Sequence, residues 1–444
     1  MIEGRGEAMN NDNCTIKITP EVSRVDEPVD IKINGLPKNE KVTIRAVSSD
    51  YYCINASILE IGDNTLWESY AVFETDECGN INLENAVPVD GTYSNCDKMG
   101  LFYSMRPKQI RKSKLIQKLS NINENRKYKI TFTVEKNGKI IASKEHTRVY
   151  CDGTIKSVDV VEKNLLARYF TSKDNIKHPA IIVLSGSDGR IEKAQAIAEL
   201  FAMRGYSALA VCYFGLEGTP EDLNMIPLEY VENAVKWLKR QDTVDENKIA
   251  IYGRSKGGEL VLLAASMFKD ITCVIANTPS CYVYEGIKNG KLPSHHSSWI
   301  YRGEEILYLK FSFHIILRLI IKMMKKEKGA LAWMYKKLIE EGDRDKATIA
   351  LDKINGSVLM ISSAADEIWP SKMHSETACS IFEKSHFKRE YKHITFSKSG
   401  HMLTVPFQSI YPSEKYPYDV ESWAEANMDS WNETVKFLEK WAIK

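Results

Sequence analysis

The sequence lacks an excess of either charge, because 60 Lys and Arg residues balance 59 Asp and Glu residues and leave a formal net charge of +1. A chain this close to neutrality has no general electrostatic attraction to nucleic acid or to an anionic membrane. We therefore expect no nucleic-acid partner, and any charged partner must be bound at a local site.

Paired cysteines are also lacking. The 444 residues contain nine cysteines, an odd number, and no C-x-x-C spacing. The odd count argues against a disulfide framework, and the spacing does not match a zinc site. We expect reduced thiols, no bound metal and a cytoplasmic location.

No long uninterrupted apolar run is present. The segment that most resembles a membrane-spanning run is ILYLKFSFHIILRLIIKMMKK, residues 306–326. Its polar members recur every four residues and are Lys310, His314, Arg318, Lys322 and Lys326. This spacing puts them along one side of a helix, which predicts an amphipathic helix rather than an integral membrane span. We favour a cap helix with a solvated basic face, and a membrane-surface helix or a basic wall beside an anionic ligand are the alternatives.

The first residues contain no apolar core of the kind a secretion signal needs. Residues 2–5, IEGR, are typical of a protease-cleavage site left by recombinant expression. We expect residues 1–9 to be such a remnant or to be disordered, and we set them aside.

The length predicts two domains. Residues 10–152 consist of short runs such as CTIKITP and KVTIRAV, which alternate polar and apolar residues and are separated by turn residues. Asn137-Gly138 lies between two such runs, and both residues tolerate the positive φ of a two-residue hairpin turn. We predict an antiparallel, immunoglobulin-like β-sandwich for this part of the chain.

Residues 153–444 instead alternate apolar strands with amphipathic helices. This order predicts an α/β domain with a mostly parallel sheet and helices on both faces. Strands are expected at 180–186, 207–214, 248–253, 272–277, 357–363 and 393–397, with helices at 192–205 and 227–241. Residues 286–350 form a lysine-rich helical insertion or cap. Active groups in such sheets gather beyond the carboxyl ends of the strands.

The motif GRSKG, residues 253–257, places Ser255 in one of those loops. A tight strand-turn-helix corner lifts a serine hydroxyl clear of the sheet edge, where it can attack a carbonyl group. The alternative is packing, because small residues also let a helix lie close to a strand. The motif needs partners before it predicts a nucleophile.

A serine nucleophile needs a base, and the base needs an acid that orients it. Asp366 and His401 follow two later predicted strands, and the order Ser, Asp, His is that of hydrolases with this architecture. Asp366 alone could be a helix cap, and Glu367 could take the same role. The competing histidines are His178, His295, His296, His374 and His386, whose positions fit the role less well.

Acyl transfer passes through an oxyanion, so two amide donors should face Ser255. We assign one to the backbone N–H of Lys256 and the other to Ser187 or Gly186, in the loop after strand 180–186. A plain glycine turn is the alternative for that loop.

Several of these stretches resemble the acyl-CoA thioesterase and bile acid-CoA:amino acid N-acyltransferase family. They are residues 26–46, 97–107, 204–241, 251–267, 366–371 and 399–406, so the resemblance covers nearly the whole chain. It implies an α/β-hydrolase domain preceded by a sandwich, with Ser255 as nucleophile, Asp366 as acid, His401 as base and an acyl-CoA thioester as substrate. Residues 286–350 lie outside the stretches that carry the resemblance, so the resemblance does not assign the acyl chain.

Members of that family that conjugate acyl groups to amino acids have cysteine as nucleophile, whereas hydrolytic members generally have serine. Ser255 therefore favours hydrolysis over amino-acid conjugation, with no cofactor. Weaker expectations are contacts of Arg254, Lys310, Arg318 and Lys322 with the CoA phosphates. The alternatives are a carboxylesterase or peptidase with the same triad, and a binding protein of this fold without turnover.

Overall fold

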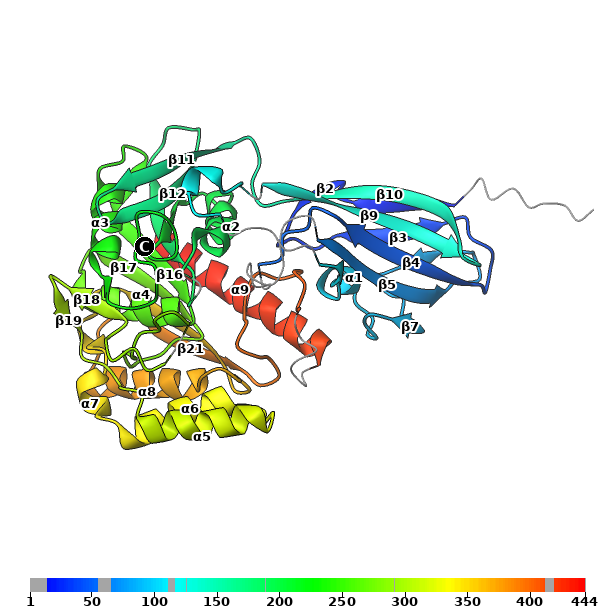
Figure 1. The fold of residues 1–444 in the computed structure, drawn as a ribbon. Coiled ribbons are helices and arrows are strands. Elements are labelled where there is room, and N and C mark those ends of the chain that lie inside the picture. The colour runs from blue at the N-terminus through cyan, green and yellow to red at the C-terminus, as the bar shows by residue number, and fades with distance from the viewer. Residues whose placement is uncertain are drawn as a thin grey trace, which may run out of the picture. The chain divides into compact units, whose positions relative to one another are not determined.

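A computed structural model describes residues 14–54, 65–110, 116–124, 126–187, 189–290, 292–411 and 419–443 (Figure 1). The chain divides into two compact units. The first comprises residues 1–114, 127–149 and 407–414, and the second comprises residues 115–126, 150–406 and 415–444. The predicted remnant at residues 1–9 lies outside the described residues.

The first unit consists of two β-sheets. One has the order β1-β3-β6, and the other has the order β2-β10-β9-β4-β5-β7, with β8 paired to β5. All strand pairs are antiparallel except β2 with β10. The strands are β1 Thr15–Thr19, β2 Val22–Arg24, β3 Asp30–Asn34, β4 Lys41–Ser48, β5 Leu66–Glu74, β6 Ile81–Asn82, β7 Asp90–Gly91, β8 Arg106–Gln109, β9 Lys127–Lys136 and β10 Lys139–Val149. A short helix, α1, spans Gly100–Tyr103.

The sandwich core follows from alternation along the strands. Every second residue of β4 and β5 is buried, which places Ile44 and Trp67 inside with 1% exposure each. The predicted hairpin is confirmed: Lys136 pairs with Lys139, and Asn137 and Gly138 have φ of 51° and 75°.

The second unit is built on an eight-stranded sheet with the order β11-β12-β14-β13-β16-β17-β20-β21. β12 is antiparallel to both neighbours, and the remaining pairs are parallel. The strands are β11 Ile155–Glu162, β12 Leu165–Ser172, β13 His178–Leu184, β14 Ser207–Cys212, β16 Val244–Arg254, β17 Ile271–Asn277, β20 Ser357–Ser363 and β21 Tyr391–Phe396. This arrangement is an α/β-hydrolase fold and confirms the predicted fold class. The edge hairpin of β11 and β12 was not anticipated from the sequence.

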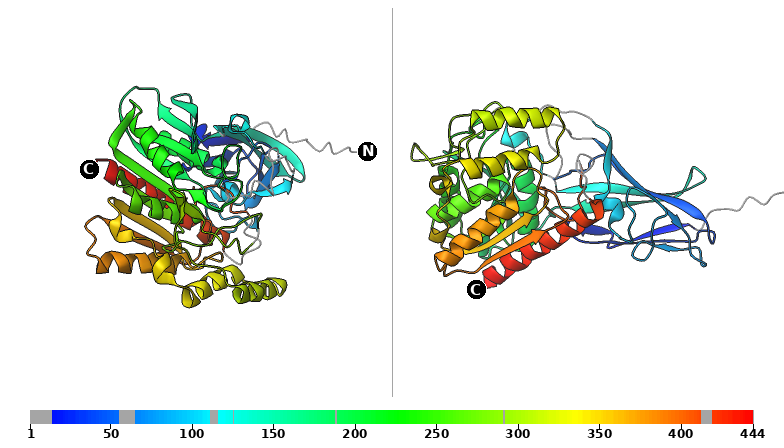
Figure 2. Two further views of the ribbon diagram at one scale, coloured as in Figure 1. Left: turned by 60° about the vertical axis from the view of Figure 1, so that its left-hand side comes forward. Right: turned by 90° about the horizontal axis from the view of Figure 1, so that it is seen from below.

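Helices cover both faces of this sheet (Figures 1 and 2). α2 (Ile191–Ala202) and α9 (Val420–Ile443) share one face, where Phe201 stacks on Trp431 with ring centroids 5.3 Å apart. α3 (Glu229–Lys239), α4 (Lys256–Met267) and α8 (Ser371–Lys384) pack into one apolar core on the other face. The long final helix α9 carries no motif that singled it out in the sequence.

The insertion contains α5 (Phe313–Met324), α6 (Ala330–Glu341), α7 (Arg344–Ala347), β18 (Trp299–Tyr301) and β19 (Glu304–Glu305). Its two strands form a small sheet with β15 (Ile226–Pro227), which precedes the insertion in the chain. The described residues also include two 3₁₀ turns, η1 Leu119–Asn121 and η2 Leu351–Lys353. No helix in the described part of the chain is both long and apolar enough to cross a membrane.

The prediction of one helix over residues 306–326 is wrong at both ends. Leu309 is extended, because its N–H donates to the Val283 carbonyl (2.8 Å) and its carbonyl accepts from Glu285 N (3.0 Å). Lys326 has a left-handed φ of 54° and lies beyond the helix end. Lys310 and Lys326 are therefore not on α5. The predicted basic side chains on α5 do face solvent, since His314 and Arg318 are exposed and Lys322 is half-buried, but large apolar side chains of the helix are exposed as well.

Candidate active site

Ser255 lies on a strained corner between β16 and α4. Its φ of 57° and ψ of −121° fall in a region that residues with a side chain rarely adopt. The flanking glycines allow this corner because the backbone passes very close to itself. A Cβ at Gly253 would lie 2.3 Å from the Gly257 carbonyl oxygen, and one at Gly257 would lie 2.0 Å from the Ser185 carbonyl oxygen. The two glycines are therefore required by packing, and the strain at Ser255 points to a role beyond packing.

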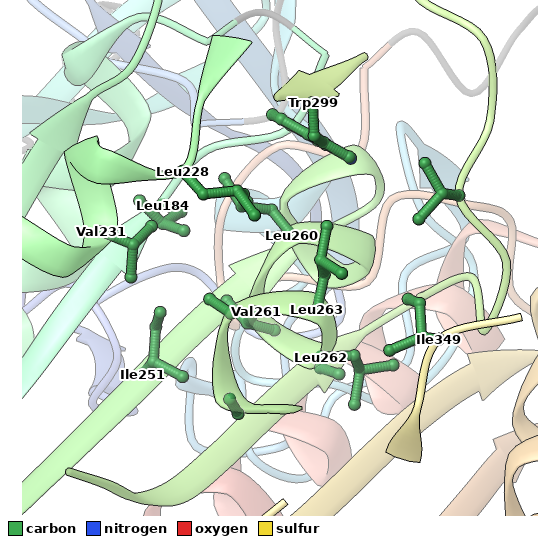
Figure 3. Close-up of a cluster of buried hydrophobic side chains, with 14 of the residues drawn as sticks. Leu184, Leu228, Val231, Ile251, Leu260, Val261, Leu262, Leu263, Trp299 and Ile349 are labelled. Atoms are coloured by element: carbon green, nitrogen blue, oxygen red, sulfur yellow. The ribbon is translucent and has the colours of Figure 1, made fainter. Parts of the chain in front are cut away.

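Helix α4 holds this corner rigidly. Residues Leu260, Val261, Leu262 and Leu263 are at most 5% exposed and point to different sides of the helix, as Figure 3 shows. A helix that is apolar all round lies inside the protein. Its N-terminus presents backbone N–H groups that have no partner within the helix, and that of Lys256 is the first of them.

His401 and Asp366 lie together after β21 and β20. Nδ1 of His401 is 2.9 Å from each carboxylate oxygen of Asp366. The two side chains are 5% and 1% exposed. The N–H groups of Ile368 and Trp369 also donate to Asp366 Oδ1 (3.0 and 3.2 Å), so the carboxylate is held by its own loop.

The neighbouring acid, Glu367, takes a different position. Its Oε2 accepts the backbone N–H of His401 (3.0 Å), whereas the hydrogen bonds of the imidazole Nδ1 are with Asp366. Burial raises the pKa of Glu367, and the charge of Asp366 adds to that effect. Glu367 thus fastens the histidine loop, whereas Asp366 orients the ring.

The loop after β13 approaches Ser255 closely. A Cβ at Gly186 would lie 3.3 Å from the Ser255 Cβ and 3.8 Å from its Oγ. The Tyr213 hydroxyl donates to the carbonyl oxygens of both Ser185 (3.0 Å) and Gly186. Those carbonyls belong to the peptide units whose N–H groups are on Gly186 and Ser187, so one hydroxyl fixes the plane of both expected oxyanion donors.

These loops meet at the topological switch point of the sheet. β13 pairs with β14 on one side and with β16 on the other, and ligands of such sheets bind beyond the strand ends at that point. Gly186 follows β13 and Ser255 follows β16, so both border this position.

Two residues that the sequence did not single out tie the loops together. The Asn277 carbonyl accepts the backbone N–H of Ser255 (2.8 Å), and its side-chain Nδ2 donates to the Leu403 carbonyl (3.0 Å), two residues after His401. The Trp369 indole donates to the Thr278 carbonyl (3.0 Å), and its ring lies 5.9 Å from that of His401. The available signals were their positions, because Asn277 is the last residue of β17 and Trp369 lies in the loop between β20 and α8.

A buried ion pair lies directly behind the nucleophile. Nζ of Lys256 is 2.6 and 2.7 Å from the carboxylate oxygens of Glu259, and the two side chains are 7% and 0% exposed. The Trp299 indole donates to the same carboxylate (2.7 Å). Burial lowers the pKa of Lys256 and raises that of Glu259, and each partner's charge opposes these shifts. The Lys256 side chain therefore points into the core and leaves only its amide for a substrate.

The weaker sequence candidates have other contacts. Arg254 is 6% exposed, and its Nη1 is buried without a hydrogen-bond partner among the described residues. Lys310 lies over the Tyr308 ring (5.8 Å), and Arg318 and Lys322 lie over Trp333 (5.3 and 5.0 Å).

Three of the five competing histidines have contacts or surroundings that do not suit a catalytic base. His178 bonds Asp174 (2.9 Å), and His296 bonds Glu305 (2.9 Å). His374 is fully buried, and burial lowers its pKa to about 3. Within the described ranges, no three His, Cys, Asp or Glu side chains lie together in a way that could hold a metal ion.

Comparisons with known proteins cover both units. Residues 26–162 match the profile described as "Acyl-CoA thioester hydrolase/BAAT N-terminal region", and residues 226–444 match "BAAT / Acyl-CoA thioester hydrolase C terminal". The chain belongs to the acyl-CoA thioester hydrolase/BAAT family. The resemblance noted in the sequence is thereby confirmed, and the family is one of enzymes.

Members of the acyl-CoA thioester hydrolase/BAAT family with related sequences carry two kinds of name. Acyl-coenzyme A amino acid N-acyltransferase 1 of Mus musculus is 23% identical over 439 residues, covering 95% of this chain and 96% of that protein. Acyl-coenzyme A thioesterase 1 of Homo sapiens is 23% identical over 429 residues, covering 94% and 93%. A solved α/β hydrolase from Penicillium sp. sh18 is 21% identical, covers 65% of this chain and 99% of its own, and has a TM-score of 0.38.

Proposed function

We propose that this protein hydrolyses acyl-CoA thioesters to the free acid and CoA through a covalent acyl-enzyme on Ser255. The observation that carries the proposal is the bond between His401 Nδ1 and Asp366, at 2.9 Å. With Nδ1–H donated to the carboxylate, Nε2 is left to accept a proton, which is the tautomer a general base needs.

In the proposed reaction, Ser255 Oγ attacks the thioester carbonyl while its proton passes to Nε2 of His401. The amides of Lys256 and of Ser187 or Gly186 bind the oxyanion, the C–S bond breaks, and the imidazolium returns the proton to the CoA sulfur. His401 then takes a proton from water, which attacks the acyl ester; the acyl–Oγ bond breaks, the imidazolium returns the proton to Ser255 Oγ, and the acid is released. Asp366 keeps the ring oriented throughout. Each step uses groups of this chain, with the thioester as the only other reactant besides water.

Water is the favoured acceptor because the nucleophile is serine. An acyl-thioenzyme reacts more readily with amines than an acyl-oxyester does. The relatives named N-acyltransferases make transfer to an amino acid the second candidate.

The decisive experiment measures thiol release from acyl-CoAs of varied chain length, with and without glycine or taurine. We expect turnover without an amine and its loss in Ser255→Ala. Ser187→Ala is the matched control, because it removes a hydroxyl from the same site and keeps the backbone N–H, so most activity should remain.

Other outcomes would replace the proposal. Release of thiol only when an amine is present, with formation of the amide, would make the protein an N-acyltransferase. Faster turnover of nitrophenyl esters than of every acyl-CoA would make it a carboxylesterase. Full activity in Ser255→Ala, or no turnover of any substrate, would refute a serine mechanism.

A further inference from the structure

Helix α5 presents an apolar face to solvent. The large apolar side chains that are exposed on and just before it are Leu307, Phe313, Leu317, Ile320, Ile321, Met323 and Met324, with exposed fractions from 44% to 79%. Isolated exposed apolar residues are common on proteins, but a continuous patch of them marks a site of interaction.

The patch is turned away from the core. At about 100° per residue, Phe313, Leu317, Ile320 and Met324 fall within an arc of about 60°. Ile315 and Leu319, which are 1% and 6% exposed, lie on the opposite side and anchor α5 in the protein. The helix therefore has one apolar face packed on the protein and a second one with no cover among the described residues.

Cationic side chains are concentrated on this helix and at the end of the second face. Residues 306–329 contain six Lys and Arg against one acid, Glu327, in a chain whose formal net charge is +1. Arg318 and Lys322 lie on the other side of α5, where they rest on the ring of Trp333. Lys325, Lys326 and Lys328 are exposed at its end. This insertion is therefore a local concentration of positive charge on a nearly neutral chain.

We propose that α5 docks the protein on the surface of an anionic lipid bilayer. An apolar face of Phe, Leu, Ile and Met, with Lys and Arg elsewhere on the helix and at its end, is the pattern by which a helix lies in the interface between headgroups and acyl chains. With 12 residues, α5 is too short to cross a bilayer, so it lies on the membrane surface. This inference does not depend on the reaction proposed above.

The same charges disfavour a second copy of the chain as the occupant. A symmetric dimer with the two α5 helices parallel would bring their lysine-rich ends together, and the like charges would repel. Anionic lipid headgroups complement the lysine-rich end while the acyl chains cover the apolar face.

The test is co-sedimentation of the full chain with vesicles of phosphatidylcholine plus phosphatidylserine, and with vesicles of phosphatidylcholine alone. We expect binding to the anionic vesicles that weakens with added salt. The variant Leu317→Ser/Ile320→Ser/Met324→Ser should bind at least about tenfold more weakly. Lys325→Glu/Lys326→Glu should lose the preference for phosphatidylserine.

The matched control is Val158→Ser/Val161→Ser on β11, two apolar residues that are 49% and 72% exposed and lie far from α5 in sequence. It should bind vesicles as the parent does. Thermal unfolding of each variant shows whether the fold is kept, which we expect because all these side chains are exposed. Failure of the parent to bind anionic vesicles, or equal binding by the α5 serine variant, would overturn the proposal. A dimer that dissociates in that variant, without vesicle binding, would assign the face to a second copy instead.

Discussion

Asp366 holds His401 through both of its carboxylate oxygens, each 2.9 Å from the imidazole Nδ1. The two residues are 35 positions apart in the chain and follow adjacent parallel strands, β20 and β21. Parallel strands bring their carboxyl ends to one edge, so residues that follow two neighbouring strands can meet there. This contact holds the imidazole in one orientation and leaves its Nε2 as the nitrogen that can accept a proton.

Asp366→Asn should lower kcat by about 10⁴-fold, because an amide at this position favours the wrong imidazole tautomer. Glu367→Gln is the control on the adjacent acid. It can still accept the backbone N–H of His401 through its amide oxygen, and we expect less than about a tenfold change. Steady-state kinetics on one acyl-CoA compares the two. A larger loss in the Glu367 variant would reverse their roles.

Tyr213→Phe tests whether the loop after β13 supplies an oxyanion donor. Without its hydroxyl, the Ser185 and Gly186 carbonyls lose the bond that orients their peptide units, so kcat should fall by about tenfold with little change in KM. Tyr230→Phe removes a comparable hydroxyl contact, to the Gly218 carbonyl (3.3 Å), away from the site. It should leave both constants as they are, and an equal effect of the two variants would speak against a role of Tyr213 in the oxyanion hole.

Removing one partner of the Lys256–Glu259 pair should lower the free energy of unfolding strongly, whereas replacing both partners should change it little. Lys256→Met leaves a buried carboxylate without its cation and should lower the free energy of unfolding by about 3–5 kcal/mol. The double variant Lys256→Met/Glu259→Leu removes both charges and should recover most of that loss. Urea unfolding of the parent, the single variants and the double variant completes the cycle. Additive losses would show that the pair does not act as a unit.

Glu199 on α2 should make stability depend on pH. Burial raises its pKa from 4.5 to about 8, the negative charge of Glu124 adds to this, and the positive charges of Arg126 and Arg168 oppose it. The native state therefore keeps a proton that the unfolded chain has lost, and stability falls as pH rises from about 4.5 to about 8, by at most about 1.4 kcal/mol per unit.

Glu199→Gln removes this titration. We expect its unfolding free energy to exceed that of the parent by a margin that grows across this window and is constant above it, measured by urea unfolding at several pH values. Glu217→Gln, at an exposed side chain, should show no such trend. A constant difference between Glu199→Gln and the parent at all pH values would contradict the predicted titration.

The sequence by itself determined the architecture and the family. Alternating polarity in residues 10–152 places the apolar side chains on one face of each strand, which predicts a sandwich. After residue 153, apolar strands alternate with amphipathic helices, which predicts a parallel sheet covered by helices. Local periodicity was therefore enough to predict two kinds of sheet. The Ser255 corner was equally readable, because the close backbone approaches at Gly253 and Gly257 admit no side chain.

Only the tertiary structure decided what surrounds that corner. The roles of Asp366 and Glu367 are separated by which oxygen reaches a ring and which reaches a backbone N–H, and adjacent residues of like charge carry no local signal for this difference. The same holds for α5. Its sequence shows a cationic stripe, but which side faces the core depends on the elements packed against it, and that packing leaves an apolar side in solvent. Contacts between segments far apart in the chain, such as that of Asn277 with Leu403, exist only once the sheet has formed.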